Sequence, residues 1–299
     1  MQLENMFFGA SYEKMTAVLG NSCGALQLLP FPNFEREGGK KSWLTLKALD
    51  LNGKEIIAEL PKADSTAHED IYARTDTWWS MIDLKALDPA KILEKKLEED
   101  SEKTEIRDFY IENVNIVKKF QNSILASYHP NSYAHYGSDE NHKSFNEIVW
   151  ETKARLNITD ADDLIEYVGA SANTDEDDKS EDSDTNEQRL DMGGPIRITR
   201  DVGDLPSISL QATDGQDWFT GDGVRTIKTE SGKKISFLLK MKPTSDGDGT
   251  VCHESGADVQ KANIKNYYVM KGIEHSASYG DKEVQLNTLY NIAKVMEEL

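Results

Sequence analysis

The sequence predicts an α/β fold in which a helical region stands on a strand-rich region. Three observations support this prediction. A long helical pattern runs through residues 90–128, with apolar residues at spacings of three to five in its second half. Short strand-like segments separated by turn residues follow within residues 146–240. The chain then closes on a strand, a loop and an amphipathic helix at residues 284–299.

The first part of the chain predicts a mixed segment of helices and strands. Residues 15–29 are apolar and interrupted by glycine, which suits a short packed helix or loop. Residues 43–51 alternate as a strand does, and Asn52-Gly53 predicts a tight hairpin turn into a second strand at residues 55–59.

The changes of pattern divide the chain into four predicted regions. These are a mixed α/β segment (residues 1–85), a helical cap or lid (86–145), a strand-rich core (146–240) and a C-terminal segment (241–299). The cap is predicted to end in a loop rich in His and Tyr at residues 128–145. An acidic loop at residues 172–189 is predicted to be disordered; its residues 173–188 contain eight acidic residues and one lysine.

The composition excludes some partners. The chain has 53 acidic and 34 basic residues and a formal net charge of −19, so the phosphates of nucleic acid or of an anionic membrane would be repelled. One alternative use of the acidic residues is a Ca²⁺-binding module. It would draw on Asp246 and Asp248 together with Asp175, Asp177 and Asp184, although no EF-hand pattern is present.

Other cofactors and targeting signals are not expected. Cys23 and Cys252 make neither a disulfide framework nor a metal quartet. The N-terminus has no basic and apolar regions of a signal peptide, and no apolar run reaches the roughly twenty residues that span a bilayer. The chain is therefore predicted to start in the cytoplasm without a transmembrane segment.

Two residues near the C-terminus predict an acid and a base. A strand-like segment at residues 237–241 leads into a glycine-rich turn that holds Asp248, a position where α/β sheets place functional side chains. His275 follows on a loop between a last strand and a final helix, the order expected for an α/β-hydrolase base. Asp246 is the weaker choice of acid, and His253 is the second choice of base.

A candidate nucleophile is harder to place. Gly20-Asn21-Ser22-Cys23-Gly24 matches the G-x-S-x-G pattern, and the order Ser, Asp, His agrees with a triad. However, few residues precede this motif, and Pro30 shortens the helix that should follow it. Ser22 is therefore expected to lie in a packed loop or a short helix.

Several segments together resemble a known family. They are residues 15–30, residues 42–46, residues 69–79, the loop at residues 129–137, Gly247-Asp248-Gly249-Thr250-Val251, and Glu274-His275. In this order they look like the C-terminal part of bacterial lipase-like α/β-hydrolases. These hydrolases are the PGAP1-like and lecithin:cholesterol acyltransferase-like branches and the phospholipase effectors of type VI secretion.

The resemblance implies an α/β-hydrolase with a helical cap that cleaves carboxyl esters of lipids. Asp248 would be the triad acid and His275 the base, while Cys252 stands where the family usually has proline. The family's nucleophile belongs to a stretch that would lie before Met1, and Ser22 falls where the family has a structural loop. The implied partners are a lipid or ester substrate and a protein: the N-terminal half, an immunity protein or a secretion protein. Export by a contact-dependent apparatus would then be expected.

The same residues are also compatible with a second class of function, a non-catalytic binding or regulatory protein. Without a nucleophile of its own, the chain could be a non-catalytic remnant that binds a partner of an intact hydrolase. Ester hydrolysis by the purified protein distinguishes the two interpretations.

Overall fold

The computed structural model describes residues 12–99, 105–125, 127–168, 210–211, 217–219, 223–229, 232–240 and 243–297. Its helices are α2 (Tyr12–Gly20), α3 (Cys23–Leu26), α4 (Leu84–Leu87), α5 (Ile92–Glu99), α6 (Ile106–Ile124), α7 (Ala161–Ile165), α8 (His253–Gly256) and α9 (Lys282–Glu297), with shorter helical turns at η1 (Glu37–Gly39), η2 (His68–Tyr72), η3 (Ala257–Lys261) and η4 (Ser278–Gly280). Its strands are β1 (Leu44–Asp50), β2 (Glu55–Leu60), β3 (Tyr133–Gly137), β4 (Asp139–Ser144), β5 (Ile148–Leu156), β6 (Leu210–Gln211), β7 (Asp217–Phe219), β8 (Val224–Lys228), β9 (Lys234–Lys240), β10 (Ser245–Gly247) and β11 (Asn266–Met270). The predicted α/β class is confirmed.

The central sheet has five strands in the order β2-β1-β5-β9-β8. β1 and β5 run parallel, and the other neighbours are antiparallel, so the sheet is mixed. The side chains of β1 are mostly buried, as suits an inner strand, whereas those of β2 alternate between exposed and buried, as suits an edge. The predicted hairpin between them is confirmed, and Gly53 adopts the positive φ of +84° that its turn requires.

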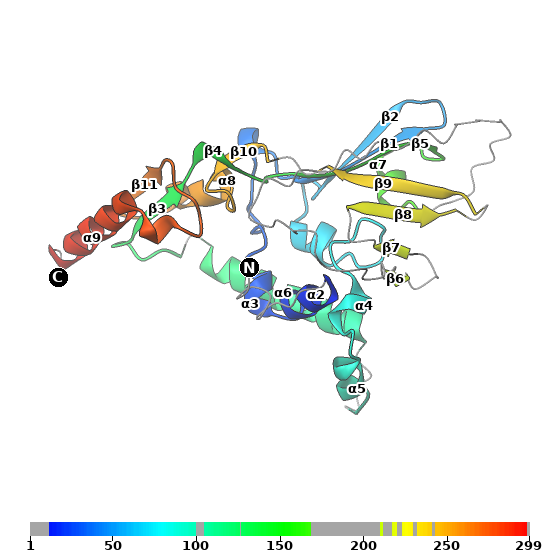
Figure 1. Ribbon diagram of the computed structural model, residues 1–299, viewed down its shortest axis with the longest axis horizontal. Helices are drawn as coiled ribbons and strands as arrows, with labels where there is room; N and C mark the ends of the chain where they lie inside the picture. The colour runs from blue at the N-terminus through cyan, green and yellow to red at the C-terminus, as the bar shows by residue number, and fades with distance from the viewer. Residues whose placement is uncertain are drawn as a thin grey trace, which may run out of the picture.

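The main core lies between this sheet and the helices α2, α3, α4 and α6, which gather on one side of it (Figure 1). The two layers meet at Trp78 and Phe237, whose rings stack with 3.7 Å between centroids and are almost completely buried. Trp150 of β5 packs edge-on against Trp78. The helix α6 contributes Val114 and Val117 to the same cluster. The apolar face of the predicted helix is therefore packed against the core.

A smaller unit forms from the last part of the chain and one distant segment. β3 and β11 pair in parallel, β4 and β10 pair antiparallel, and α9 lies against the first pair (Figure 1). Its separate core consists of Met270, Ile273 and Val284, with Tyr268 packed beside them.

Two local predictions were wrong. The loop expected at residues 128–145 is in fact β3 and β4, because its strands are held by partners far along the chain that a local pattern does not reveal. The predicted strand is present over residues 237–240, which lie in β9 of the central sheet, but β9 does not lead directly into Asp248. The short strand β10 intervenes and positions that residue.

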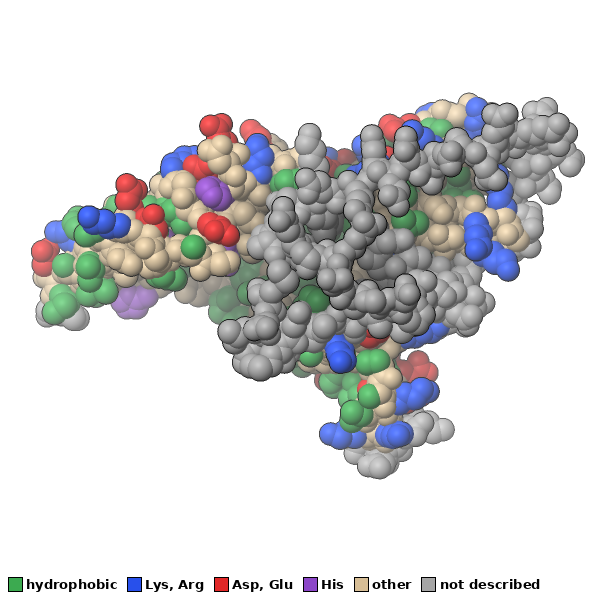
Figure 2. Space-filling view, viewed as in Figure 1, with side chains coloured by type: hydrophobic (Ala, Val, Ile, Leu, Met, Phe, Trp, Pro, Cys, Tyr) green, Lys and Arg blue, Asp and Glu red, His purple; other side chains and the backbone are tan. Residues whose placement is uncertain are grey.

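The final helix is amphipathic as predicted, but its apolar face is turned outward. Four apolar side chains of α9, here called the α9 stripe, are between 52% and 68% exposed: Leu286, Leu289, Ile292 and Met296. The two buried positions of the helix are Val284 and Asn291. Figure 2 shows hydrophobic side chains gathered at this end of the molecule.

Some predictions are not tested by the structure and remain predictions. The acidic loop at residues 172–189 and the strand expected at residues 196–199 lie outside the described residues. The division into a cap and a hydrolase core remains a prediction. Across the described ranges, none of the helices combines the length and the apolar character needed to cross a membrane.

Candidate functional site

Asp248 lies in a tight turn that the structure builds from glycine and backbone hydrogen bonds. Here residues 247–251 are called the acid turn. Oδ1 of Asp248 accepts hydrogen bonds from the backbone N–H groups of Thr250 (3.0 Å) and Val251 (2.7 Å). A Cβ on Gly247 would overlap with Ser144 and Val251, and Gly249 has a φ of +86°. The glycines on both sides of Asp248 are therefore needed for this turn.

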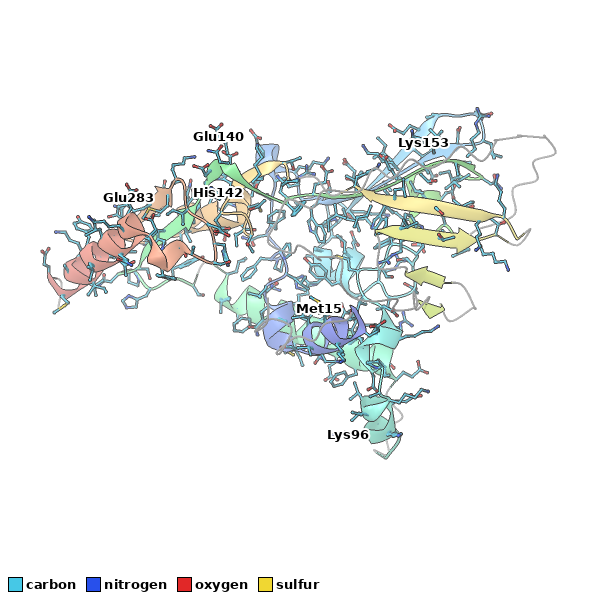
Figure 3. All side chains as sticks on the ribbon, viewed as in Figure 1. Met15, Lys96, Glu140, His142, Lys153 and Glu283 are labelled. Carbon is cyan, nitrogen blue, oxygen red and sulfur yellow. The ribbon has the colours of Figure 1, made fainter. Side chains whose placement is uncertain are left out.

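The acid turn is fixed against the neighbouring strands. The N–H of Gly249 donates to the carbonyl of His142, which is labelled on β4 in Figure 3 (2.9 Å). Gly137, the last residue of β3, lies so close that a Cβ there would sit 2.7 Å from the Cβ of Asp248. The strand ends therefore decide where the carboxylate of Asp248 points.

His275 is bound to Asp248 at two points. Its ring Nδ1 lies 2.9 Å from Oδ2 of Asp248, and its backbone N–H donates to the carbonyl of the same residue at 2.9 Å. The carboxylate is largely buried at 14% side-chain exposure, whereas the imidazole is 47% exposed. The predicted acid and base are thus brought together.

The geometry fixes which ring nitrogen is free. An ionised carboxylate only accepts hydrogen bonds, so the Nδ1 of His275 must carry the proton that it shares with Asp248. Nε2 then has a lone pair, and it has no hydrogen-bond partner among the described residues. An exposed, oriented imidazole of this kind can accept a proton from a hydroxyl or a water molecule.

Replacing Gly137 with alanine tests how the acid is positioned. The added methyl group should push Asp248 away and lower the free energy of unfolding by about 1–3 kcal/mol, the usual cost of overpacking. Urea unfolding measures this loss. Gly280→Ala is the matched control, because a Cβ there would meet no atom within 4 Å. Equal stability of the two variants would show that the close approach of Gly137 and Asp248 is wrong.

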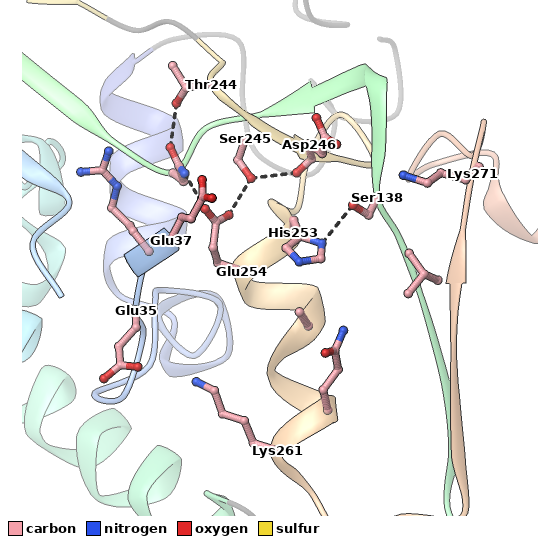
Figure 4. A pocket seen from close by; sticks show the side chains of 15 residues that line it. Glu35, Glu37, Ser138, Thr244, Ser245, Asp246, His253, Glu254, Lys261 and Lys271 are labelled. Carbon is pink, nitrogen blue, oxygen red and sulfur yellow. Dashed lines mark hydrogen bonds between the residues drawn. The ribbon is translucent and has the colours of Figure 1, made fainter. Parts of the chain in front are cut away.

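His253, the second choice of base, occupies a different position. Its Nδ1 lies 3.0 Å from Oγ of Ser138, and the structure records no carboxylate bonded to its ring within the described residues. It lines a polar hollow of about 750 Å³ together with Asp246 (Figure 4). Burial alone would raise the pKa of the neighbouring Glu254, but hydrogen bonds, chiefly from Ser245, hold that pKa below its usual value. Glu254 therefore stays ionised and bonded within the wall of the hollow.

Ser22 is placed as the cap of a helix. Its Oγ accepts a hydrogen bond from the backbone N–H of Ala25 at 3.3 Å, at the start of the four-residue helix α3. That helix packs against α2 and α6, and no described contact joins Ser22 to Asp248 or His275. This is the packed short helix that the sequence predicted.

Replacing Ser22 with alanine separates a capping role from a chemical one. Loss of the cap is expected to lower the free energy of unfolding by about 1 kcal/mol, measured by urea unfolding. Ser123→Ala removes a hydroxyl from an exposed helical position and should change stability less. If Ser22→Ala instead abolished ester turnover in a folded protein, Ser22 would have to be the nucleophile after all.

The calcium alternative has no support from the described part of the chain. There, no group of three or more His, Cys, Asp or Glu residues is arranged to hold a metal ion. Asp246 lies 3.7 Å from Nζ of Lys143, and both oxygens of Asp248 are occupied by hydrogen bonds. The acidic residues Asp175, Asp177 and Asp184 lie outside the described residues.

Sequence reasoning missed the contribution of residues 137–139. Gly137 makes room for Asp248, Ser138 binds His253, and Asp139 accepts a hydrogen bond from the backbone N–H of Gly272. The available signal was the pair of strand-favouring tyrosines before the glycine in Tyr133–Gly137. The strand that they form, β3, ends at Gly137 and leads through Ser138 into Asp139 of β4, so all three residues lie beside the candidate site.

Comparison with known proteins shows a shared fold. The structure is similar to a chain in the crystal structure of the Tle4–Tli4 complex, with a TM-score of 0.58 and 18% sequence identity, over 98% of this chain and 52% of that one. The present chain thus spans about half the length of the chain it matches. No protein-family model matches the sequence, and none of the curated proteins matches it. At this level of identity the likeness concerns the fold.

Proposed function

We propose that the chain carries the acid and base of a carboxyl-ester hydrolase of the Ser-His-Asp type, acting on lipid or phospholipid esters. Asp248 is the acid and His275 the base. The observation that carries this proposal is the 2.9 Å hydrogen bond between them, made by a carboxylate whose other oxygen is held by two backbone N–H groups. The sequence resemblance to lipase-like hydrolases and the fold shared with the Tle4–Tli4 structure support it.

The proposed chemistry follows from the free Nε2 of His275. Nε2 accepts the proton of a serine hydroxyl while the serine oxygen attacks the ester carbonyl carbon. Asp248 holds the ring in the required tautomer and stabilises the imidazolium that forms. His275 then returns the proton to the leaving alcohol, and water releases the acyl group by the same steps.

The attacking serine is proposed to be none of the serines described above. None of the described serine hydroxyls is hydrogen-bonded to Nε2 of His275, and Ser22 caps α3. In the hydrolases that the sequence resembles, the serine belongs to an elbow upstream of the matched segments. Because the chain covers about half of the structure it matches, the activity of a whole enzyme is part of the proposal.

Hydrolysis of p-nitrophenyl butyrate and of phospholipid vesicles tests this function, measured with the purified protein alone and with the upstream part of such a hydrolase, which carries the serine, supplied in trans. Turnover that disappears in His275→Ala and persists in His253→Ala would support it, since His253 is bonded to a serine and not to a carboxylate. Robust turnover that is unaffected by His275→Ala would reject it. A lack of turnover in the wild type even with that upstream part supplied would favour the second candidate function.

The second candidate is a non-catalytic protein that binds a partner through the α9 stripe. A continuous apolar face is normally covered in a soluble protein, whereas the four side chains of the α9 stripe stay more than half exposed in the described structure. A second copy is disfavoured as the occupant, because each copy carries a net charge of −19. The proposed occupant is a different protein with an apolar face, and the matched chain was itself solved in a complex.

Leu289→Asp, in the middle of the α9 stripe, tests this second function. A partner recovered with the wild type should be lost with Leu289→Asp. It should be kept with Leu28→Asp, which alters an apolar residue elsewhere that is even more exposed, at 87% against 63% for Leu289. If the partner is recovered equally with both variants, and the protein has esterase activity by itself, the second function is ruled out.

A further inference from the structure

We propose that Asp139 is a positioning residue for the base, and that its carboxylate holds the loop carrying His275 in register with the acid turn. The loop in question, residues 271–275, is called the base loop. The inference rests on the proposed function, because it concerns how the acid and base are kept together. Asp139 touches no reacting atom in this arrangement.

The first observation is a direct bond between Asp139 and the base loop. Oδ2 of Asp139 accepts the backbone N–H of Gly272 at 2.9 Å, three residues before His275. Gly272 has a φ of +68°, so the chain turns sharply there as it leaves β11. The loop is therefore fixed at its bend by a side chain from another strand.

The second observation is the position of Asp139 opposite the acid turn. In the pairing of β4 with β10, Asp139 lies directly across from Gly247, the residue before Asp248. The preceding residue, Ser138, donates its N–H to the carbonyl of Met270 at the end of β11. Ser138 thus binds the residue just before the base loop, and Asp139 binds Gly272 within it. Asp139 also lies opposite the first residue of the acid turn.

The third observation is that the carboxylate is fully committed to this role. Oδ1 of Asp139 accepts the N–H of Asn141 at 2.8 Å, and the residue is only 8% exposed. Backbone hydrogen bonds from Asn141 and Gly272 hold the pKa of Asp139 below its usual value. His142, whose Nδ1 lies 3.7 Å from Oδ1, is the titratable side chain nearest to it among the described contacts. An ionised carboxylate that accepts two backbone N–H groups can join two segments of the chain.

An amide cannot replace this carboxylate. In Asp139→Asn one of the two oxygens becomes an NH₂ group, so one of the two backbone N–H groups faces a donor. The turn at Asn141 is local and keeps the oxygen, whereas Gly272 is distant in sequence and loses its acceptor. The base loop should then move, and the ring of His275 should separate from Asp248.

The test measures the tautomer of His275 by ¹⁵N NMR at a pH where the ring is neutral. Imidazole by itself favours the proton on Nε2, whereas the bond to Asp248 requires it on Nδ1. The wild type should show the Nδ1–H form, and Asp139→Asn should lose it. Asp281→Asn is the matched control, since Asp281 also accepts two backbone N–H groups, at the start of α9, but is not bonded to the base loop.

The outcomes distinguish the positioning role of Asp139 from the proposed function. An Nε2–H form in the wild type would overturn the pairing of Asp248 with His275 and the proposed function with it. An Nδ1–H form retained in Asp139→Asn would overturn only the positioning role. If Asp139→Asn fails to fold, Asp139→Ser takes its place, because the shorter side chain can still cap the turn at Asn141 but cannot reach Gly272. Unfolding of both variants beside a folded Asp281→Asn would show that Asp139 serves stability and not positioning.

Discussion

Replacing Asp248 with asparagine is expected to lower ester turnover, measured with the serine supplied on the upstream part of the hydrolase, by about 10⁴-fold, the loss typical of a triad whose acid becomes an amide. In this structure the reason is specific. Oδ1 already accepts two backbone N–H groups of the acid turn, so the amide oxygen should stay there and turn the NH₂ group toward His275. The Nδ1 of the ring must then accept, which leaves its proton on Nε2, where the base needs a lone pair.

The measurement compares kcat for the wild type, Asp248→Asn and Asp246→Asn. Asp246 is the matched control, because it lies two residues away, is partly exposed and faces Lys143 in place of His275. Asp246→Asn should stay close to the wild type. Equal losses in both variants would mean that the general negative charge of this turn matters and the bond to His275 does not.

A large loss of stability is expected on acidification, and it should originate at one buried histidine. His68 is 2% exposed and packs edge-on against Tyr72, and no carboxylate is bonded to its ring among the described residues. Burial, with a smaller contribution from the charge of Lys118, lowers the pKa of His68 to about 4. The folded protein therefore keeps this ring neutral under conditions in which the unfolded chain protonates it.

The sign of the effect follows from this difference. As the pH falls below the unfolded value of about 6.5, the unfolded chain binds a proton that the folded protein binds only near pH 4. The free energy of unfolding should therefore drop by about 3 kcal/mol between pH 7 and pH 4. The pKa of Glu69, lowered to about 2 chiefly by Lys118, adds a further loss only at pH values below its ordinary range.

Urea unfolding at pH 7 and pH 4 checks this prediction with His68→Leu, which cannot bind the proton. The variant should lose about 3 kcal/mol less than the wild type over this interval. His129→Leu alters an exposed histidine and should follow the wild type. A wild-type pH dependence that persists in His68→Leu would assign the acid sensitivity to other groups.

The sequence alone predicted the elements whose signals are local. Asn52-Gly53 marks its hairpin because the turn needs a residue that tolerates positive φ. The apolar spacing of residues 106–124 matches the helix α6, whose buried face includes Val114 and Val117. The contact between Asp248 and His275 was also predictable, because a glycine-rich turn and a histidine loop after the last strand suit that pairing.

The rest depended on contacts between distant residues. β3 pairs with β11, in a register that joins Tyr133 to Asn266, and no local pattern in either segment names the other. For the same reason the sequence could not show that Asp139 meets Gly272. The outward apolar face of α9 could not be foreseen either, because periodicity shows that a helix has two faces but not which one packs.

The small core beneath the acid and base has a consequence for the order in which the protein loses structure. Met270, Ile273 and Val284 form a cluster separate from the large aromatic core between the central sheet and its helices. A unit with so few buried apolar contacts opens at a lower free energy than the whole fold. Heating should therefore release the base loop and α9 first, so that amide protons of residues 266–275 exchange while those of β1 and β5 are still protected. The site would then be the first part of the molecule to melt.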